Sequence, residues 1–529
     1  EPERVAALRY SAKASEIGPT LLFVNTRDTA EAMGVRWNMW DQDASIHVHH
    51  GSLSKGVRIE AEEDYRQGNV NTLICTSSLE LGIDVGNTAL VIQYNSPRDP
   101  SRMSQRLGRS GHRIKETAIG RIVSTEATQI LESAVIARRT LAGELEPSRI
   151  REMPMAVLAN QIISWTVCDK NVEKSEFLKI IKKAYPFRKL NDTIIEDLLE
   201  LLDQVHQNRT IGKSVRQGPR AMKYFHGNLS LIPDQRTYGV RDITTQKMIG
   251  RLDERFILDL APGDRIVFRG SVWAVVEIDE QVTVSPSSSL GELPRWIGED
   301  IPVPYSVALE ASERLSKKDW NGLPITDEAR AVLDDYHTSI LDEGVMPSPK
   351  CLSIEQHERL FIVNYPGGSR LNRTIGMIIT AMLSARSGYK VGYQFDPYRI
   401  ILDAPSRTTV KDMLAIMKGF KKGISDLLRF SIRDSPALKS QLLHSARKMG
   451  AIGPEADVSR FGMRRLIEAY SDTPLYTEAI ERILFHQLDE EGMEEFIEKI
   501  NSGQVSVVLS PKTPHGYAGL DPYRDYLNP

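Results

Sequence analysis

The chain has few cysteines and no hydrophobic run long enough to cross a membrane. Its 529 residues include only three cysteines, Cys75, Cys168 and Cys351, which lie far apart. An odd number of widely spaced cysteines provides neither a disulfide framework nor the paired spacing of a zinc site. No apolar segment approaches the roughly 20 residues that a membrane span needs. We therefore expect a reducing, cytoplasmic location, no metal site built by the cysteines, and no membrane partner.

Two further features are missing: an initiating methionine or signal peptide at the start, and any surplus of positive charge. The N-terminus reads Glu1-Pro2-Glu3-Arg4, so we expect the chain to be part of a longer protein. The formal net charge is -3, but nucleic-acid binding follows local patches of charge, not the total. The positions of the arginines therefore matter more than their number. The length predicts roughly three to five domains.

Strand-like and helical runs alternate over the first 140 residues or so. Buried-strand patterns occupy residues 20–24, 46–48, 72–75 and 89–92, and residues 26–40 have helical spacing. Such alternation predicts a parallel sheet with helices on both faces. Ligands of such sheets bind at the carboxyl ends of the strands.

Polar segments follow three of these predicted strands. They are Asn25-Thr26-Arg27, the run from His49 to Ser54, and Thr-Ser-Ser-Leu-Glu-Leu-Gly-Ile-Asp at residues 76–84. Backbone amides, hydroxyls and helix N-termini hold phosphates without much net charge. For any one loop alone, however, Ser and Thr that simply cap helices are the better explanation.

A fourth segment, residues 101–113, is rich in arginine. The arginines recur at helical spacing, so several should project from one face. A salt-bridged face would interleave carboxylates, and the nearest ones in the sequence are Asp99 and Glu116, at the two ends of the segment. The pattern therefore favours an anion-facing surface. The arginines are Arg102, Arg106, Arg109 and Arg113.

Taken in order, these four segments resemble the motifs of the second RecA-like domain of superfamily 2 helicases. Residues 22–27 resemble motif IV, and residues 50–54 with Arg58 resemble the segment after it. Residues 76–86 resemble motif V, and residues 105–113 resemble motif VI. Four matches in one order are much more specific than any single match.

The resemblance implies an ATP site at this edge of the sheet. Arg109 would be the arginine finger that stabilises charge on the γ-phosphate, and Asp84 would suit a ribose hydroxyl. Many relatives have a second arginine where His112 stands, with Arg113 one place later here, so which of the two faces the nucleotide stays open. The catalytic candidates are Arg109, Arg113 and Gln105, and the nucleotide-binding candidates are Gly82, Asp84, Arg109 and His112. Candidates for holding the nucleic-acid backbone are Arg27, His50, Gly51, Ser52, Thr76 and Ser77.

The phosphate-binding half of such a site is not in the sequence. The only Gly-Lys-Ser, at residues 212–214, has Gln207 where the first glycine of a phosphate loop belongs, and no buried strand precedes it. There is also no Asp-Glu-x-His or Asp-Glu-Ala-Asp box to hold magnesium. We therefore expect ATP with Mg²⁺ to need an N-terminal RecA-like domain of the same protein, and this chain alone to be inactive.

Beyond the RecA-like domain at residues 1–145, the patterns predict three more domains. Residues 146–228 are mainly helical and carry a basic edge, which suits a winged helix, although a solvated charged face explains it nearly as well. Short strands at residues 229–307 predict a small β-barrel. Residues 308–529 predict an α+β domain. In it, Gly367-Gly368 is better explained as a hairpin turn than as a phosphate-binding turn. The basic edge comprises Lys213, Arg216, Arg220 and Lys223.

Trp296 follows Arg295 and Pro294 in a predicted loop, where it suits a platform for stacking a base. From the residues alone, a tryptophan that caps the barrel core is an equally good explanation. The order of the domains resembles the core of the Lhr (large helicase-related) helicases, and by that resemblance Trp296 would contact a base, with Trp273 the runner-up. The nucleic-acid candidates beyond the first domain are Arg216, Arg220, Trp296 and Trp273.

The same resemblance implies a function. We expect an ATP-dependent translocase that moves 3′ to 5′ on single-stranded DNA and unwinds DNA or RNA:DNA duplexes in DNA repair, in the cytoplasm and nucleoid of a prokaryote. The alternative from another class is a nucleic-acid-binding scaffold that never hydrolyses ATP. The sequence does not decide between DNA and RNA, or name the repair pathway.

Overall fold

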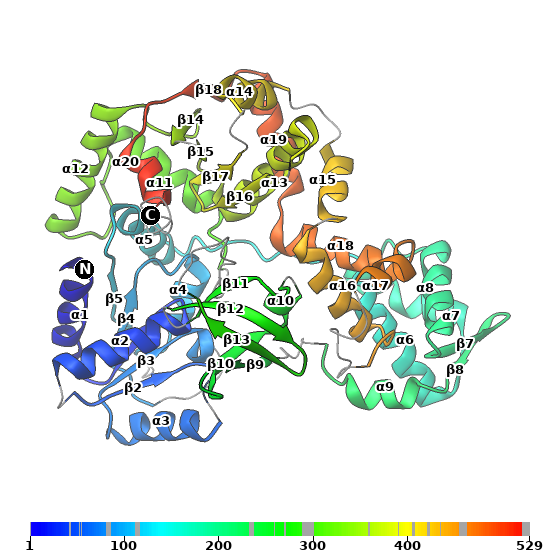
Figure 1. The fold of residues 1–529 in the computed structure, drawn as a ribbon. Helices are drawn as coiled ribbons and strands as arrows, with labels where there is room; N and C mark the ends of the chain where they lie inside the picture. The colour runs from blue at the N-terminus through cyan, green and yellow to red at the C-terminus, as the bar shows by residue number, and fades with distance from the viewer. Residues whose placement is uncertain are drawn as a thin grey trace. The chain divides into compact units, whose positions relative to one another are not determined.

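The chain, coloured from blue at its N-terminus to red at its C-terminus in Figure 1, folds into two compact units. Unit 1 consists of residues 1–147, 297–422 and 491–529, and unit 2 consists of residues 148–296 and 423–490. Residues 423–490 thus pack with the residues predicted as winged helix and barrel, although they fall within the predicted C-terminal domain. The computed structural model describes residues 2–41, 44–51, 53, 55–80, 86–111, 117–231, 237–258, 260–268, 271–287, 301–357, 360–389, 391–404, 408–419, 424–433, 435–453 and 463–520.

The N-terminal part of unit 1 is a parallel-sheet domain, as the alternation of strands and helices predicted. Its strands pair in the order β2-β3-β1-β4-β5, and every pairing is parallel. The strands are β1 (Thr20–Phe23), β2 (Ile46–His49), β3 (Thr72–Cys75), β4 (Leu90–Tyr94) and β5 (Gly120–Val123). The helices are α1 (Pro2–Ser15), α2 (Arg27–Trp40), α3 (Lys55–Gln67), η1 (Ser77–Leu79), α4 (Pro100–Leu107) and α5 (Ala127–Leu141).

Both faces of this sheet are buried. Successive side chains of a strand point to opposite faces, and each face packs against helices. Leu22 on β1 packs in a cluster with Trp37 of α2, and Phe23, one residue later, packs with Tyr65 of α3. The central strands β1 and β3 are buried throughout, and each continues as a hydrophobic run after its first threonine.

The C-terminal sheet domain of unit 1 is built on a second sheet, in the order β16-β17-β15-β14-β18. Gly367 precedes α13 and Gly368 begins it, so the predicted hairpin turn is wrong. Gly368 has φ +69, and a Cβ atom there would lie 2.8 Å from the backbone nitrogen of Tyr305. The strands are β14 (Cys351–His357), β15 (Leu360–Asn364), β16 (Gly392–Phe395), β17 (Arg399–Asp403) and β18 (Ser506–Leu509). The helices are α11 (Tyr305–Lys317), α12 (Asp327–Glu343), α13 (Gly368–Ser387), α14 (Val410–Lys418), α19 (Glu490–Asn501) and α20 (Pro514–Leu520).

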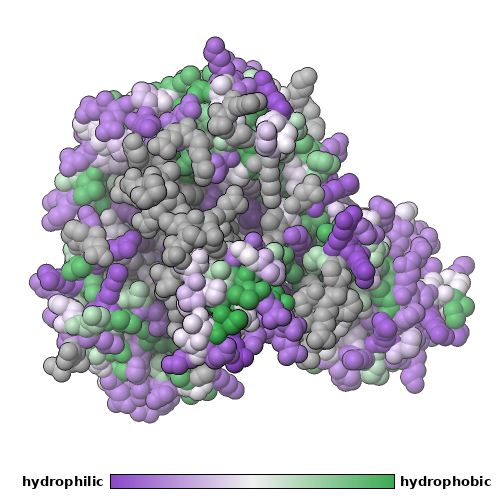
Figure 2. Space-filling model, in the orientation of Figure 1, coloured by the Kyte–Doolittle hydropathy of each residue, from purple (hydrophilic) through white to green (hydrophobic). Residues whose placement is uncertain are grey.

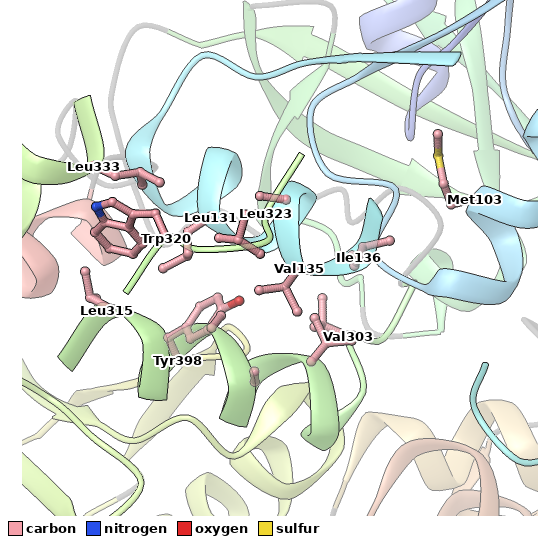
Figure 3. Packing of buried hydrophobic residues seen from close by; sticks show 14 of the residues in the cluster. Met103, Leu131, Val135, Ile136, Val303, Leu315, Trp320, Leu323, Leu333 and Tyr398 are labelled. Atoms are coloured by element: carbon pink, nitrogen blue, oxygen red, sulfur yellow. The ribbon is translucent and has the colours of Figure 1, made fainter. Parts of the chain in front are cut away.

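One hydrophobic cluster joins the two domains of unit 1 (Figure 3). Met103 of α4 and Val135 of α5 belong to it, together with Val307 of α11, Trp320 after that helix, and Tyr398. Val135 and Val307 are fully buried. Burial of apolar area stabilises by about 25 cal/mol per Å². The parallel-sheet domain and the C-terminal sheet domain therefore share one hydrophobic cluster.

The first part of unit 2 combines helices with a small antiparallel sheet in the order β6-β8-β7, the arrangement of a winged helix. Gly212 and Lys213 form the turn of the β7–β8 hairpin, and Gly212 has φ +59. A hairpin turn followed by a strand is not a phosphate loop, so the Gly-Lys-Ser match is accidental, as expected. The elements are α6 (Met155–Asp169), β6 (Asn171–Glu173), α7 (Lys174–Ile181), η2 (Tyr185–Phe187), α8 (Asp192–Gln204), β7 (Asn208–Ile211), β8 (Ser214–Gln217) and α9 (Ala221–Gly227).

A further sheet follows in unit 2, in the order β10-β9-β13-β12-β11 around a core that includes Val240 and Val284. Where a barrel was predicted, the described strands leave β10 and β11 at the two edges of the sheet. Figure 2 shows hydrophobic side chains over this part of the chain, where Ile243, Met248 and Val276 are exposed. The elements are β9 (Thr237–Asp242), β10 (Met248–Asp253), α10 (Glu254–Ile257), β11 (Arg265–Phe268), β12 (Ser271–Ile278) and β13 (Gln281–Pro286).

Four helices from later in the chain complete unit 2. Arg151 binds Glu478 of α18 with its Nη2 2.6 Å from the carboxylate, and the Tyr224 hydroxyl donates to the Lys448 carbonyl at 2.6 Å. Both contacts are buried or nearly so, which explains why these helices pack with the winged helix. No described helix of either unit is long and apolar enough to cross a membrane. The four helices are α15 (Ile424–Arg433), α16 (Pro436–Lys448), α17 (Met463–Tyr470) and α18 (Pro474–Gln487).

Candidate nucleotide and nucleic-acid site

The predicted site residues that follow β1, β2 and β3, where the structure describes them, lie at one edge of the parallel sheet. Phe23 lies opposite Cys75, and Cys75 lies opposite His49 on its other side, so the three strands end level with one another. The segments that follow them begin at the same edge because the strands are parallel. Arg27, His50, Gly51, Thr76 and Ser77 belong to these segments. Ser52, Gly82, Asp84, His112, Arg113 and Trp296 lie outside the described residues.

Glu80 is the centre of the arginine-rich part of this edge. Its side chain is 6% exposed and accepts from Nε of Arg106 at 2.8 Å and from Nη1 of Arg102 at 3.1 Å. The prediction that the arginines of residues 101–113 form one anion-facing surface is therefore wrong for Arg106, and Arg102 shares the same carboxylate. Sequence reasoning missed Glu80 because it lies 26 residues before Arg106, on another loop.

Arg106 also connects the segment that follows β1 with strand β4. Its side chain is fully buried, with Nη1 3.3 Å from Oδ1 of Asn25 and a second contact to the side-chain oxygen of Gln93. The guanidinium stacks over the ring of Phe23, 5.2 Å from its centroid. Asn25 in turn donates to the Ser96 carbonyl at 2.8 Å. Arg106 is thus a structural cation that ties three strand ends together.

Arg109 lies in the turn after α4, not on the helix itself. The helix ends at Leu107, and the Arg109 backbone nitrogen donates to the Arg106 carbonyl at 3.1 Å. Its Nη2 donates to the backbone carbonyl of Glu80 at 2.8 Å, and the residue is half-buried. The two loops that carry Glu80 and Arg109 are therefore held against each other. Gln105 is exposed on α4.

A buried histidine lies at the same edge, at the end of β2. His49 lies 2.8 Å from Ser78 through Nδ1 and 2.8 Å from Glu62 through Nε2. Burial lowers the pKa of His49 below its ordinary value, although Glu62 acts in the opposite direction. In the neutral ring, Nε2 donates to the Glu62 carboxylate and Nδ1 accepts from the Ser78 hydroxyl. The Ser78 hydroxyl is thereby occupied within the protein.

The threonines of the site differ in what they do locally. Thr26 accepts from the backbone nitrogen of Thr29 at 3.1 Å and caps α2, so helix capping accounts for this residue. Thr76 stands at the same position before η1, but its side chain makes no capping hydrogen bond. Capping does not explain Thr76, and the prediction that it holds a phosphodiester stays open. His50 lies 2.8 Å from Glu31 through Nε2.

In unit 2, the described candidates lie on two different sheets and just before α9. Arg216 is exposed on β8, and its Cα partner across the β7–β8 hairpin is Arg209, which is also exposed. Directly opposed like charges destabilise a hairpin, so an anionic ligand bound between them would relieve a repulsion. Arg220 is exposed before α9. Trp273 is half-buried and packs against the core of the β9–β13 sheet, and its contact with a base stays a prediction.

Metal ligands are not grouped in the described part of the chain. No group of three or more His, Cys, Asp or Glu side chains there could hold a metal ion.

Three family models match the chain and together cover most of it. Residues 3–114 match "Helicase conserved C-terminal domain", residues 138–292 match "Large helicase-related protein, winged helix domain", and residues 346–514 match "DEAD/H associated". The parallel sheet and the segments at its edge therefore define the second motor domain of a superfamily 2 helicase.

Relatives and a solved structure narrow this class. The chain is 26% identical to the ATP-dependent helicase Lhr-Core of Sulfolobus acidocaldarius, over 92% of this chain and 61% of the relative. It is 25% identical to the Methanocaldococcus jannaschii protein of the same name, over 93% of this chain and 62% of the relative. The chain belongs to the Lhr family of helicases and spans about three fifths of the length of these curated relatives.

The fold agrees with this assignment. A structure of the Mycobacterium smegmatis helicase Lhr bound to ssDNA and AMP-PNP superposes with a TM-score of 0.76. It is 20% identical to the chain, and the match covers 97% of this chain and 68% of that one. At this identity the likeness establishes the fold, including the winged helix and the additional sheets.

Proposed function

We propose that the chain is the second motor domain and strand-gripping part of an ATP-dependent translocase that moves 3′ to 5′ on single-stranded DNA. The observation that carries this proposal is the placement of Arg109. Its guanidinium is anchored to the Glu80 carbonyl at 2.8 Å, at the sheet edge where parallel-sheet proteins bind ligands. The names of the relatives and the AMP-PNP bound to the M. smegmatis protein support it.

The residues of this edge fit the phosphate end of ATP. Arg109 is half-buried, so its charge is only partly screened by water, and its Nη2 is oriented by a neutral carbonyl. A fixed cation in such a place stabilises charge that develops on a transferring phosphoryl group. ATP with Mg²⁺ supplies the phosphoryl group when bound. The metal ligands and the phosphate loop would come from the N-terminal RecA-like domain of the same protein, so this chain alone should not hydrolyse ATP.

The remaining residues of the edge would hold the nucleic-acid strand. Thr76 and Ser77 bring hydroxyls, and the start of α2 brings Arg27. Contacts of this kind to phosphates position a strand without reading its sequence. Hydrolysis would then change how the two motor domains face each other, and the strand would advance. We place this activity in DNA repair, in the prokaryotic cytoplasm.

The proposal is tested with the full-length protein on tailed duplexes. We expect ATP-dependent strand displacement from DNA and RNA:DNA duplexes with a 3′ single-stranded tail, and little from those with a 5′ tail. Displacement from 5′ tails alone would contradict the polarity. Binding of the strand with no ATP hydrolysis would identify the scaffold that we keep as the alternative.

The arginine pair of the β7–β8 hairpin gives a separate expectation for strand binding. If Arg209 and Arg216 both contact phosphates, replacing both with alanine removes two counterion-releasing contacts. The slope of log Kd against log salt should then fall by roughly 0.7 per contact on single strands, or 0.9 on duplex DNA. The measurement is a salt titration of fluorescence anisotropy.

A charge-matched control separates contact from net charge. Lys182 and Lys183 are exposed just after α7 in the same winged helix, and replacing both with alanine removes the same two charges. We expect a smaller change of slope for that variant. Equal slopes for the two double variants would show that the hairpin pair has no special role.

A further inference from the structure

A buried carboxylate connects the two domains of unit 1. Glu132, on α5, is 1% exposed and accepts from two side chains that lie far apart in the sequence. The Tyr398 hydroxyl donates to Oε2 at 2.9 Å, and Arg98 Nη1 donates to Oε1 at 3.1 Å. Tyr398 belongs to the turn between β16 and β17, and Arg98 belongs to the loop between β4 and α4. The C-terminal sheet domain thus contacts the motor domain through a charge-assisted chain of hydrogen bonds.

Arg98 lies just before α4, the helix that leads to Arg109. Arg98 has φ +70, which is unfavourable for a residue with a side chain, and its backbone nitrogen donates to the Ser96 hydroxyl at 3.1 Å. The next residue, Asp99, caps α4 by accepting from the backbone nitrogens of Ser101 and Arg102 at 2.7 and 3.1 Å. A strained backbone persists only where its surroundings hold it. Glu132 is one of the groups that hold it.

The backbone at Tyr398 is itself held in place by hydrogen bonds. Its backbone nitrogen donates to Oδ1 of Asp396 at 2.8 Å, and Oδ2 of the same carboxylate accepts from Nε of Arg399 at 2.7 Å. Asn372 of α13 donates to the Asp396 carbonyl at 2.9 Å. The Tyr398 ring is 8% exposed and packs in the shared core (Figure 3). Burial raises the pKa of Tyr398 well above its ordinary value, so the phenol keeps the proton that it donates.

We propose that Tyr398 and Glu132 are positioning residues of the motor, through which the C-terminal sheet domain sets the position of α4 and thereby of Arg109. This inference rests on the proposed function. Two fixed ends and a buried carboxylate leave the β4–α4 loop little freedom. The C-terminal sheet domain then contributes to ATP turnover and not only to gripping the strand.

The test replaces single hydroxyls in the full-length protein. Tyr398→Phe removes the hydrogen bond to Glu132 and keeps the ring in the core. We expect kcat of strand-stimulated ATP hydrolysis to fall about tenfold, because small displacements of a positioned group cost up to roughly a hundredfold in rate. KM for ATP and the Kd for single-stranded DNA should stay unchanged, because the contact acts on the transition state.

Tyr336→Phe is the matched control. The Tyr336 hydroxyl lies 2.7 Å from Nδ1 of His515 of α20, and its ring packs against the same core, but it does not contact Glu132. We expect both variants to lose a similar amount of thermal stability and only Tyr398→Phe to lose kcat. Equal losses of kcat would assign Tyr398 to stability alone and overturn the inference.

A double variant tests the path itself. Glu132→Gln disturbs the same chain of contacts, since an amide accepts through one oxygen only. If Tyr398 acts through Glu132, the double variant should be no slower than the slower single variant. Multiplicative losses, or a Tyr398→Phe protein as fast as the wild type, would overturn the inference. A wild-type protein without ATPase activity would instead reject the proposed function.

Discussion

Replacing Arg109 with alanine should abolish strand-stimulated ATP hydrolysis in the full-length protein while single-stranded DNA still binds. An arginine that stabilises the transferring phosphoryl group is worth about 10³-fold or more in kcat. Arg109 is anchored to the Glu80 carbonyl by a hydrogen bond whose loss costs only about 1 kcal/mol, so the variant should fold. The measurement is the initial rate of phosphate release at saturating DNA, beside an anisotropy titration of the same DNA.

Two neighbouring variants sharpen this test. Arg109→Lys keeps the charge but loses the planar fork of donors, and we expect it to remain strongly impaired. Ser104→Ala changes an exposed side chain of α4 and should behave as the wild type. If Arg109→Ala hydrolyses ATP normally, the finger is another arginine, and Arg113 is the next to replace. If strand binding is lost together with hydrolysis, Arg109 contacts the strand and not the nucleotide.

Much of the parallel-sheet domain was predictable because its signals are local. The apolar runs of β1 and β3 are short and continuous, which is typical of strands buried on both faces. The polar residues that follow them gather at one edge through parallel pairing alone. The assignment to superfamily 2 followed from four such segments in order, and the family models confirm it.

Other features depend on contacts that no local pattern records. The arginine-rich segment was predicted to face an anion because no carboxylate lies within it, yet Glu80 reaches it from another loop. Gly367 and Gly368 have the composition of a hairpin turn but lead from β15 into α13, whose backbone passes close to Tyr305. The core shared by Val135 and Val307 was also missed, because it joins helices that are far apart in the chain.

Arg106 offers the second large effect, and the effect is on stability. Arg106→Ala should destabilise the native state by about 3–5 kcal/mol, since it leaves the Glu80 carboxylate buried without its principal partner. The lost contacts to Asn25 and Gln93 add to this cost. Urea unfolding, followed by circular dichroism, measures it.

Arg102→Ala is the control for this prediction because it removes a cation from the same carboxylate at a more exposed position. The Arg102 side chain is 33% exposed, so water compensates for part of its charge, and we expect a loss of about 1 kcal/mol or less. The contrast between the two variants separates burial from charge. If the Arg106 variant unfolds at nearly the same urea concentration as the wild type, water reaches Glu80 and the pair is not the buried anchor described above. Arg106 would then be available to an anionic ligand after all, as its place in the arginine-rich segment first predicted.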